Sequence, residues 1–129
     1  MKFKYLSTGF IVFLLFTVSI SAQKMHEIKL NKDSVNMVNP LTVDAISGNT
    51  VKFVSTGGKF RIFIENAIKI FDIDEANINI ELDDATNPES EIYVCKDVTQ
   101  DFFKVYFIIC LTNGETPDAP PIIIIRSAD

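Results

Sequence analysis

The chain has 129 residues, with no Trp, one His and two Cys. A single imidazole argues against the zinc and blue-copper sites that need two or more histidines. The hydrophobic fraction is 47%, and a chain of this length suits one domain with a hydrophobic core rather than two. The scarcity of histidine therefore argues against these metal sites before any motif is considered.

Basic residues are also scarce, since 12 Lys and Arg stand against 17 Asp and Glu, for a formal net charge of −5. No run of the sequence concentrates the basic residues. A surface of this sign repels the phosphates of nucleic acids and of anionic lipids. We therefore expect neither nucleic acid nor an anionic membrane surface as a partner.

Residues 1–22 have the three-part pattern of a secretory signal peptide. Lys2 and Lys4 come first, residues 10–18 are apolar except for Thr17, and small residues follow at Ser19, Ser21 and Ala22. The apolar run is shorter than the roughly 20 residues of a membrane span, and no comparable run follows it. We expect cleavage after residue 22, export to the periplasm or the extracellular space, and a single domain over residues 23–129 without a membrane span. Loss of the two leader lysines would take the formal net charge from −5 to −7.

The two cysteines, Cys95 and Cys110, both fall in the exported part. In an oxidising compartment, an even pair in a small domain is most often a disulfide. The sequence predicts such a bridge. Two buried free thiols, or one thiol with a separate role, remain the alternatives.

Short apolar runs with period-two alternation dominate the exported part, and turn residues separate them. The clearest is Ile78–Leu82, where Asn79 and Glu81 alternate with apolar residues. This alternation is typical of strands with one face in the core. The expected strands are 51–54, 60–64, 78–82, 91–95, 103–110 (apolar on both faces, as in a central buried strand) and 122–125. Residues 65–76 could hold one short helix or a bent connection between strands. Gly57–Gly58 signals a hairpin turn.

Two segments resemble the cupredoxin family. Pro40–Val43 followed by Ser47–Phe53 is similar to the opening of that family, in which a Pro, an apolar strand, a Gly turn and a V-x-F pattern succeed each other. Tyr106–Cys110 is similar to the strand that carries the copper thiolate, and Pro120–Ile125 suits the last strand. The resemblance implies an all-β, small Greek-key β-sandwich or barrel. An immunoglobulin-like sandwich is the alternative.

The copper ligands of that family are missing. No His follows Phe53 in Val54–Gly58, where the resemblance implies the first imidazole, and none follows Cys110 in residues 111–114. No Met lies downstream of Cys110 as an axial ligand. The resemblance therefore implies a cupredoxin-like fold without copper or another cofactor, which leaves Cys110 available to pair with Cys95.

Catalysis is not expected. His26 is the one available imidazole base, and near the new N-terminus it would be a solvated and poorly positioned side chain. No helix and no Lys-Ser/Thr pair follow Gly57–Gly58, so these glycines do not form a phosphate loop. We expect a protein that is not an enzyme.

The residues from Asp72 to Asp84 form the densest group of oxygen ligands. Asp72, Asp74, Asp83 and Asp84 are a weak alternative as a calcium site, because Ala76 and Asn77 interrupt the pattern of a calcium-binding loop. A solvated acidic edge is the simpler interpretation.

Four aromatic residues, Phe102, Phe103, Tyr106 and Phe107, lie in one segment. They are interpreted first as core packing. If some of them were exposed, they would mark a surface for a partner.

The leading hypothesis is a non-catalytic binding or structural module whose partner is an unidentified protein or small molecule. Its working surface would be loops at one end of the sandwich, including Ser55–Lys59 and Thr112–Pro121. The candidate binding residues are Gly57, Gly58, Asn113, Gly114 and Pro117. The alternative is a redox or metal-binding protein that uses Cys95 and Cys110, or the acidic residues 72–84.

Overall fold

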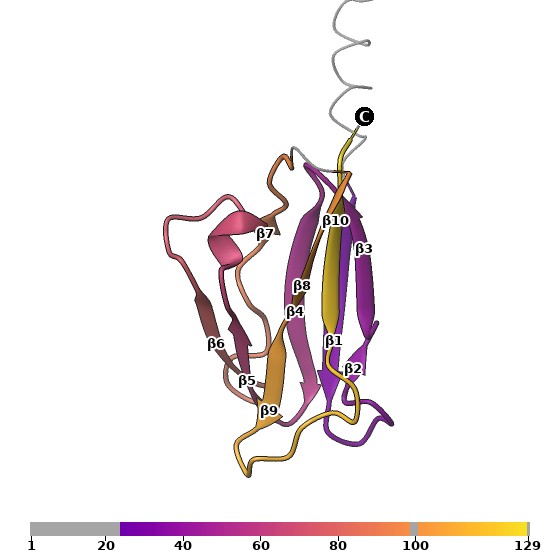
Figure 1. The fold of residues 1–129 in the computed structure, drawn as a ribbon. Helices are drawn as coiled ribbons and strands as arrows, with labels where there is room; N and C mark the ends of the chain where they lie inside the picture. The colour runs from indigo at the N-terminus through magenta and orange to yellow at the C-terminus, as the bar shows by residue number, and fades with distance from the viewer. Residues whose placement is uncertain (1–23, 99–100, 129) are drawn as a thin grey trace, which may run out of the picture.

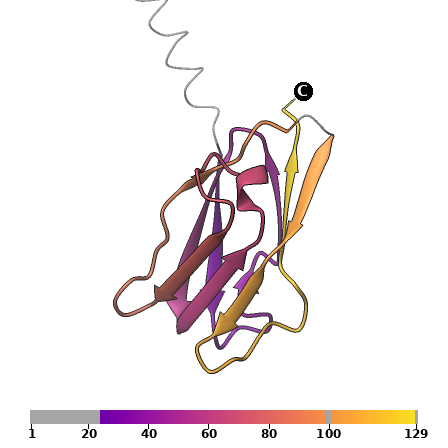
Figure 2. The same ribbon diagram turned by 60° about the vertical axis from the view of Figure 1, so that its left-hand side comes forward.

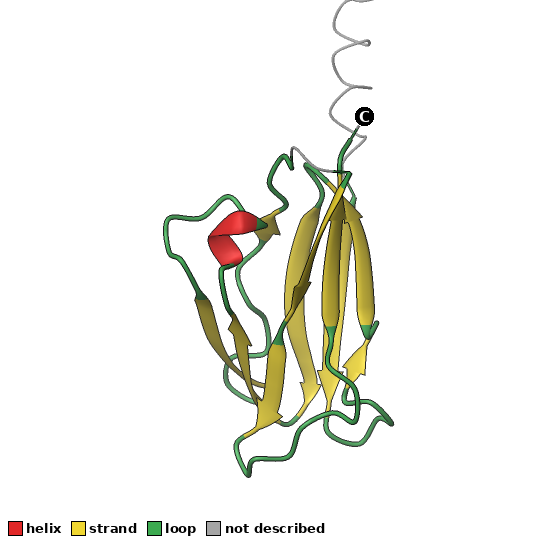
Figure 3. Ribbon diagram, in the orientation of Figure 1, coloured by secondary structure: helices red, strands yellow, loops and turns green. Residues whose placement is uncertain are grey.

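The computed structural model describes residues 24–98 and 101–128, and the expected signal peptide lies outside the described residues. Strands make up nearly all of the regular structure, with one turn of 3-10 helix (Figure 3). The prediction of an all-β protein with the layers of a small β-sandwich is confirmed.

The first sheet has the strand order β2-β1-β4-β7 (Figure 1). β1 runs parallel to β4, whereas β2 and β7 are antiparallel to their neighbours. The bounds are β1 (Met25–Asn31), β2 (Val38–Asn39), β4 (Thr50–Gly57) and β7 (Tyr93–Val94). The β1 strand was not expected from the sequence, although Ile28 and Leu30 alternate there with exposed residues.

Two three-stranded groups form the other layer, with orders β3-β10-β8 and β6-β5-β9. β8 and β9 succeed each other with a break at Phe107, so one extended segment belongs to both groups (Figure 2). β3 is parallel to β10, and the other pairs are antiparallel. The bounds are β3 (Thr42–Ile46), β5 (Lys59–Ile64), β6 (Ile78–Asp83), β8 (Phe102–Tyr106), β9 (Ile108–Leu111) and β10 (Ile122–Arg126).

The core lies between these layers and is built from alternate residues of the strands. Phe53 of β4 is fully buried, and its ring meets the rings of Tyr93 and Phe107 edge to face, with centroids 6.3 Å and 5.7 Å away. Edge-to-face pairs add to the stabilisation that aromatic burial already gives. Opposing faces of both layers thus meet around Phe53.

The Gly57–Gly58 turn differs from the expected hairpin. β4 and β5 follow each other directly, but they lie in different sheets and do not pair. Phe53 and Phe60 both point into the core from opposite sides. The turn therefore carries the chain across the core from one layer to the other.

Of the two alternatives for residues 65–76, the bent connection is the one observed, and the expected central strand is divided. Of residues 65–76, only Ala67–Lys69 form a 3-10 turn, which follows Asn66 in the left-handed conformation. The segment 103–110 is not one strand buried on both faces. It is divided at Phe107, and Tyr106 and Ile108 on its outer face are about half exposed, as is Phe102 directly before it.

In the described part of the chain, no helix has the length and apolar character needed to cross a bilayer.

Candidate functional site

The two loops expected to form the working surface meet at one end of the sandwich. This end, at the bottom of Figure 1, carries the β4–β5 turn and the connection from β9 to β10. The backbone N–H of Thr112 donates to the carbonyl oxygen of Lys59 at 3.3 Å. We call this region, comprising residues 55–59 and 112–121, the loop end.

The β4–β5 turn is held firmly by hydrogen bonds. Gly58 has a φ of +118°, a backbone conformation that residues other than glycine rarely adopt. Its carbonyl oxygen accepts from the Ser55 hydroxyl at 2.7 Å and from the Asp84 N–H at 3.3 Å. The carbonyl oxygen of Gly57 accepts from the Lys32 N–H at 2.9 Å. The β1–β2 connection and the end of β6 thereby join the loop end.

Asn113 and Gly114 form a second tight turn beside it. The Gly114 N–H donates to the carbonyl oxygen of Leu111 at 2.9 Å, and Gly114 has a φ of +94°. The Asn113 side-chain oxygen accepts from the Glu115 N–H at 3.0 Å. Each turn is thus fixed by its own hydrogen bonds, as expected for rigid loops on a β-scaffold.

A hollow of about 320 Å³ lies between these two turns. Its lining combines both signs of charge with uncharged backbone. The lining residues are Lys32, Gly58, Lys59, Asp83, Asp84, Leu111, Thr112 and Asn113. The structure therefore brings Gly58 and Asn113 into one hollow, although 54 residues separate them in the sequence. Gly57 and Gly114 shape the turns without lining it.

Pro117 belongs to a separate, more apolar hollow of about 240 Å³. Residues 116–121 form one wall of it, and Phe107, Ile108 and Ile109 form the other. Ile108 is 58% exposed, so this wall offers apolar surface to a partner.

The charge at the loop end is balanced locally. Lys59 Nζ lies 3.6 Å from Asp83 Oδ2. The pKa of Asp83 is held below its ordinary value, chiefly by the hydrogen bond from the Ala85 backbone N–H and further by Thr86 and Lys59. An ionised Asp83 beside Lys59 suits polar recognition more than proton transfer.

The expected disulfide is absent, because both cysteines are free thiols. Cys95 is buried, and its N–H donates to the carbonyl oxygen of Asn49, at the end of the sandwich opposite the loop end. Cys110 lies across from Arg61 in β5, on the outer face of its sheet. Since one thiol faces the core and the other faces outward in the other half of the molecule, they do not meet the geometry of a bridge.

The Cys95 thiol is also unsuited to redox chemistry as it stands. Burial, with a smaller contribution from Asp72, raises the pKa of Cys95 to about 11. Because the thiolate is the reactive form, the raised pKa lowers the reactivity of this thiol at neutral pH.

The acidic residues of the weak metal alternative are not brought together. Asp72 and Asp74 precede β6, whereas Asp83 and Asp84 lie at its other end. A six-residue strand spans about 20 Å. Among the described residues, no group of three or more His, Cys, Asp or Glu side chains has an arrangement suited to a metal ion.

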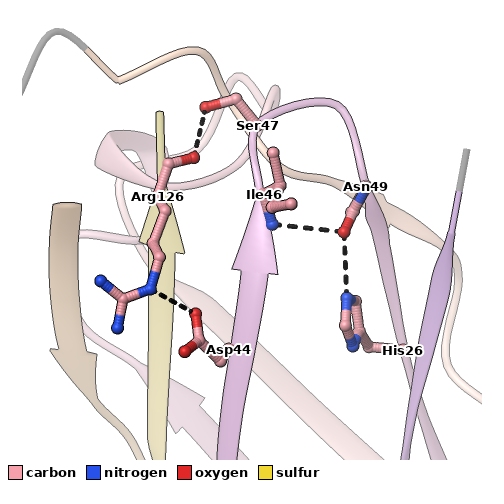
Figure 4. Close-up of polar contacts among 6 residues, drawn as sticks. All are labelled: His26, Asp44, Ile46, Ser47, Asn49 and Arg126. Carbon is pink, nitrogen blue, oxygen red and sulfur yellow. Dashed lines mark hydrogen bonds and ion pairs between the residues drawn. The ribbon is translucent and has the colours of Figure 1, made fainter. Parts of the chain in front are cut away.

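His26 is better held than the sequence suggested. It lies within β1 and is partly buried, and its Nε2 is 3.1 Å from Asn49 Oδ1 (Figure 4). The same Asn49 oxygen accepts the Ile46 N–H at 3.2 Å. The prediction of a solvated terminal side chain was wrong, because β1 pairs in parallel with β4 along its whole length.

Sequence reasoning missed Lys32 and Asp84, which line the hollow together with residues of the loop end. Lys32 follows the strand β1, whose Ile28 and Leu30 alternation was the available signal. Nothing local in the sequence indicates that Asp84 lies beside Gly58, because their contact depends on how β6 is placed.

No protein-family model matches this chain, and no curated protein matches it.

Proposed function

We propose that this chain is an exported, copper-free domain of cupredoxin-like type that acts as a non-catalytic binding module through its loop end. The observation that carries the proposal is the hydrogen bond from the Thr112 N–H to the Lys59 carbonyl oxygen. It joins two separate loops into one surface with fixed turns. Preorganised loops lose little conformational entropy on binding, which favours recognition.

The likeness to cupredoxins is supported by the positions of the segments that carry it. Thr42 and Val43 lie in β3, Val51–Phe53 in β4, and Ile122–Ile125 in β10. Tyr106–Cys110 spans the junction of β8 and β9. All of these segments belong to the two packed layers, as a β-sandwich requires.

The proposal of a copper-free domain is supported by two polar side chains near the positions where the resemblance implies copper ligands. Both are already hydrogen-bonded to the backbone. Ser55, after Phe53, donates its hydroxyl to the Gly58 carbonyl oxygen. Asn113, after Cys110, has its side-chain oxygen on the Glu115 N–H. Both side chains stabilise turns, so we assign them structural roles in the binding surface.

Site-specific photo-crosslinking in the exporting cell tests this proposal. A photoreactive amino acid at Asn113 should give a discrete adduct, and one at Lys29 in β1, which is exposed on the other sheet, should not. The additional change Lys59→Glu should reduce the Asn113 adduct, because it alters the wall of the hollow.

Adducts of equal yield at both positions, or at neither, would contradict a binding role for the loop end. The redox or metal alternative is separated by the native mass of the same exported protein. A chain of apoprotein mass agrees with the binding module, whereas a stoichiometric metal adduct would replace it with the alternative.

A further inference from the structure

Strand β8 has one open edge. Within the described residues it pairs with β10 alone. The N–H of Ser127 donates to the Asp101 carbonyl oxygen, and the N–H of Phe107 donates to that of Pro121. In an antiparallel ladder these bonds alternate, so the backbone groups of Phe103 and Val105 also face β10. Those of Phe102, Lys104 and Tyr106 face the other way.

The edge of β8 is open because of the path that the chain takes after β5. β9 pairs with β5 from Leu111 to Ile108, opposite residues 60–63. Beyond Ile64, where β5 would continue beside β8, Asn66 adopts the left-handed conformation and the chain turns into the 3-10 turn. Figure 2 shows β8 at the right-hand rim of the molecule. The space beside β8 that a further strand would occupy is therefore not filled by β5.

The side chains of β8 fit an added strand on both faces. On the outer face, Phe102 is 50% and Tyr106 is 55% exposed. On the inner face, Phe103 and Val105 pack against the core but remain only partly buried. Four of five side chains thus present apolar surface that a neighbouring strand would cover.

Lys104 sets the charge of this edge. Its Nζ lies 5.1 Å from the centroid of the Tyr106 ring, and none of the ion pairs among the described residues includes it. By contrast, Arg126, which lies over Phe102, is paired with Asp44 at 2.8 Å. An ammonium in the middle of an exposed edge strand discourages self-pairing and favours a carboxylate opposite.

We propose that the open edge of β8 is a docking site for an extended peptide that adds as a strand, with an acidic side chain opposite Lys104 and apolar side chains on either side of it. Strand addition uses the free backbone groups for affinity and alternate side chains for selectivity. This surface is separate from the loop end, so the proposal does not depend on the function proposed above.

A second copy of the chain is a poorer occupant. β8 reads Phe-Phe-Lys-Val-Tyr and has no carboxylate. Two β8 edges paired with each other would leave both Lys104 ammoniums without an opposite charge, and the chain as a whole carries a net charge of −5. A peptide with one acidic residue between apolar residues supplies the carboxylate that a second copy of β8 lacks.

Selection of random decapeptides displayed on phage against the full chain tests the proposal. The enriched peptides should share one Asp or Glu flanked by apolar residues at the two positions on each side. In fluorescence polarisation, Lys104→Glu should weaken a selected peptide roughly tenfold, because a cross-strand attraction becomes a repulsion. The same peptide with Lys in place of its acid should recover binding to Lys104→Glu.

One further variant isolates the backbone contribution to binding, and a second is its control. Lys104→Pro removes an N–H that faces away from β10, which an edge strand tolerates, and should abolish binding with the fold retained in circular dichroism. Lys29→Glu changes an exposed lysine of β1 and should leave binding unchanged. If Lys104→Pro does not fold, the proposal is tested by Lys104→Glu and the peptide with Lys in place of its acid.

Several results would overturn the proposal. They are the absence of any enriched peptide, enriched peptides without an acid, and binding that is insensitive to both Lys104 variants. A dimer seen by light scattering that Lys104→Pro dissociates would assign the edge to a second copy instead.

Discussion

The hydroxyl of Ser55 donates to the carbonyl oxygen of Gly58 at 2.7 Å, across the turn that carries the chain from one layer to the other. Ser55 is a polar residue that is almost fully buried, at 3% exposure. A satisfied buried hydroxyl at this place fixes the turn against the core. It also links the fold to the loop end, because Gly58 lines its hollow.

Replacing Ser55 by Ala should therefore lower the free energy of unfolding by about 1 kcal/mol, the usual net value of one hydrogen bond. The Gly58 carbonyl oxygen keeps the Asp84 N–H, so it is not left unpaired. Urea unfolding measures the change. Thr116→Ala, in the exposed connection to β10, is the control and should change stability by less than about 0.5 kcal/mol. An equal effect of both variants would contradict the role given to Ser55.

The two thiols should react at very different rates. The raised pKa of Cys95 lowers its thiolate fraction, so alkylation at pH 8 should be about 100-fold slower than for the same thiol in the unfolded chain. Cys110 is only half buried and faces outward, so it should react in the folded protein. Peptide mass spectrometry after iodoacetamide treatment gives both rates. Prompt labelling of Cys95 in the native state would show that its surroundings are open.

Stability should fall at alkaline pH through two buried groups. Burial raises the pKa of Cys95 to about 11, and burial with Glu91 raises that of Tyr93 to about 12. The folded state then keeps protons that the unfolded state releases, so the stabilisation is complete below about pH 9 and is lost as pH rises toward 11 and 12. Cys95 alone should contribute on the order of 2 kcal/mol to this loss.

The difference between the native chain and Cys95→Ala isolates that contribution. Urea unfolding at pH 8 and at pH 11 should show a smaller loss of stability in the variant. Identical losses would mean that Cys95 does not titrate differently in the folded and unfolded states.

Asn49 should anchor the start of the first sheet. Its Oδ1 accepts the Ile46 N–H and lies 3.1 Å from His26 Nε2, so Asn49→Ala should cost about 1–2 kcal/mol. Asn113→Ala, whose side-chain oxygen accepts the Glu115 N–H in an exposed loop, is the matched control and should cost less.

Hydrogen exchange of the Ile46 amide gives a local readout of the same change. Exchange should accelerate in Asn49→Ala and remain unchanged in Asn113→Ala. Unchanged hydrogen-exchange protection of the Ile46 amide in both variants would contradict the anchoring role of Asn49.

Most strands could be predicted from the sequence because their signal is local. The alternation of Phe60, Ile62 and Ile64 requires one buried face, whatever else the chain does. β1 was missed for a different reason. Its position beside the N-terminus expected after signal cleavage suggested fraying, and its parallel partner β4 starts 25 residues further on.

The candidate site could be predicted in part. Gly58 and Asn113 carry turn signals, and the structure brings them to one hollow. The Cys95–Cys110 bridge could not be judged from composition, because a disulfide depends on the direction of two side chains across the sandwich.

The sequence by itself determined the all-β class and the scarcity of imidazole, since strand periodicity and residue counts are properties of the chain alone. Only the tertiary structure decided that Gly57–Gly58 crosses between layers, that both thiols are free and that β8 has an open edge among the described residues. These features depend on which strands lie side by side. Strand pairing is set by contacts between residues far apart in the sequence, and local patterns do not encode such contacts.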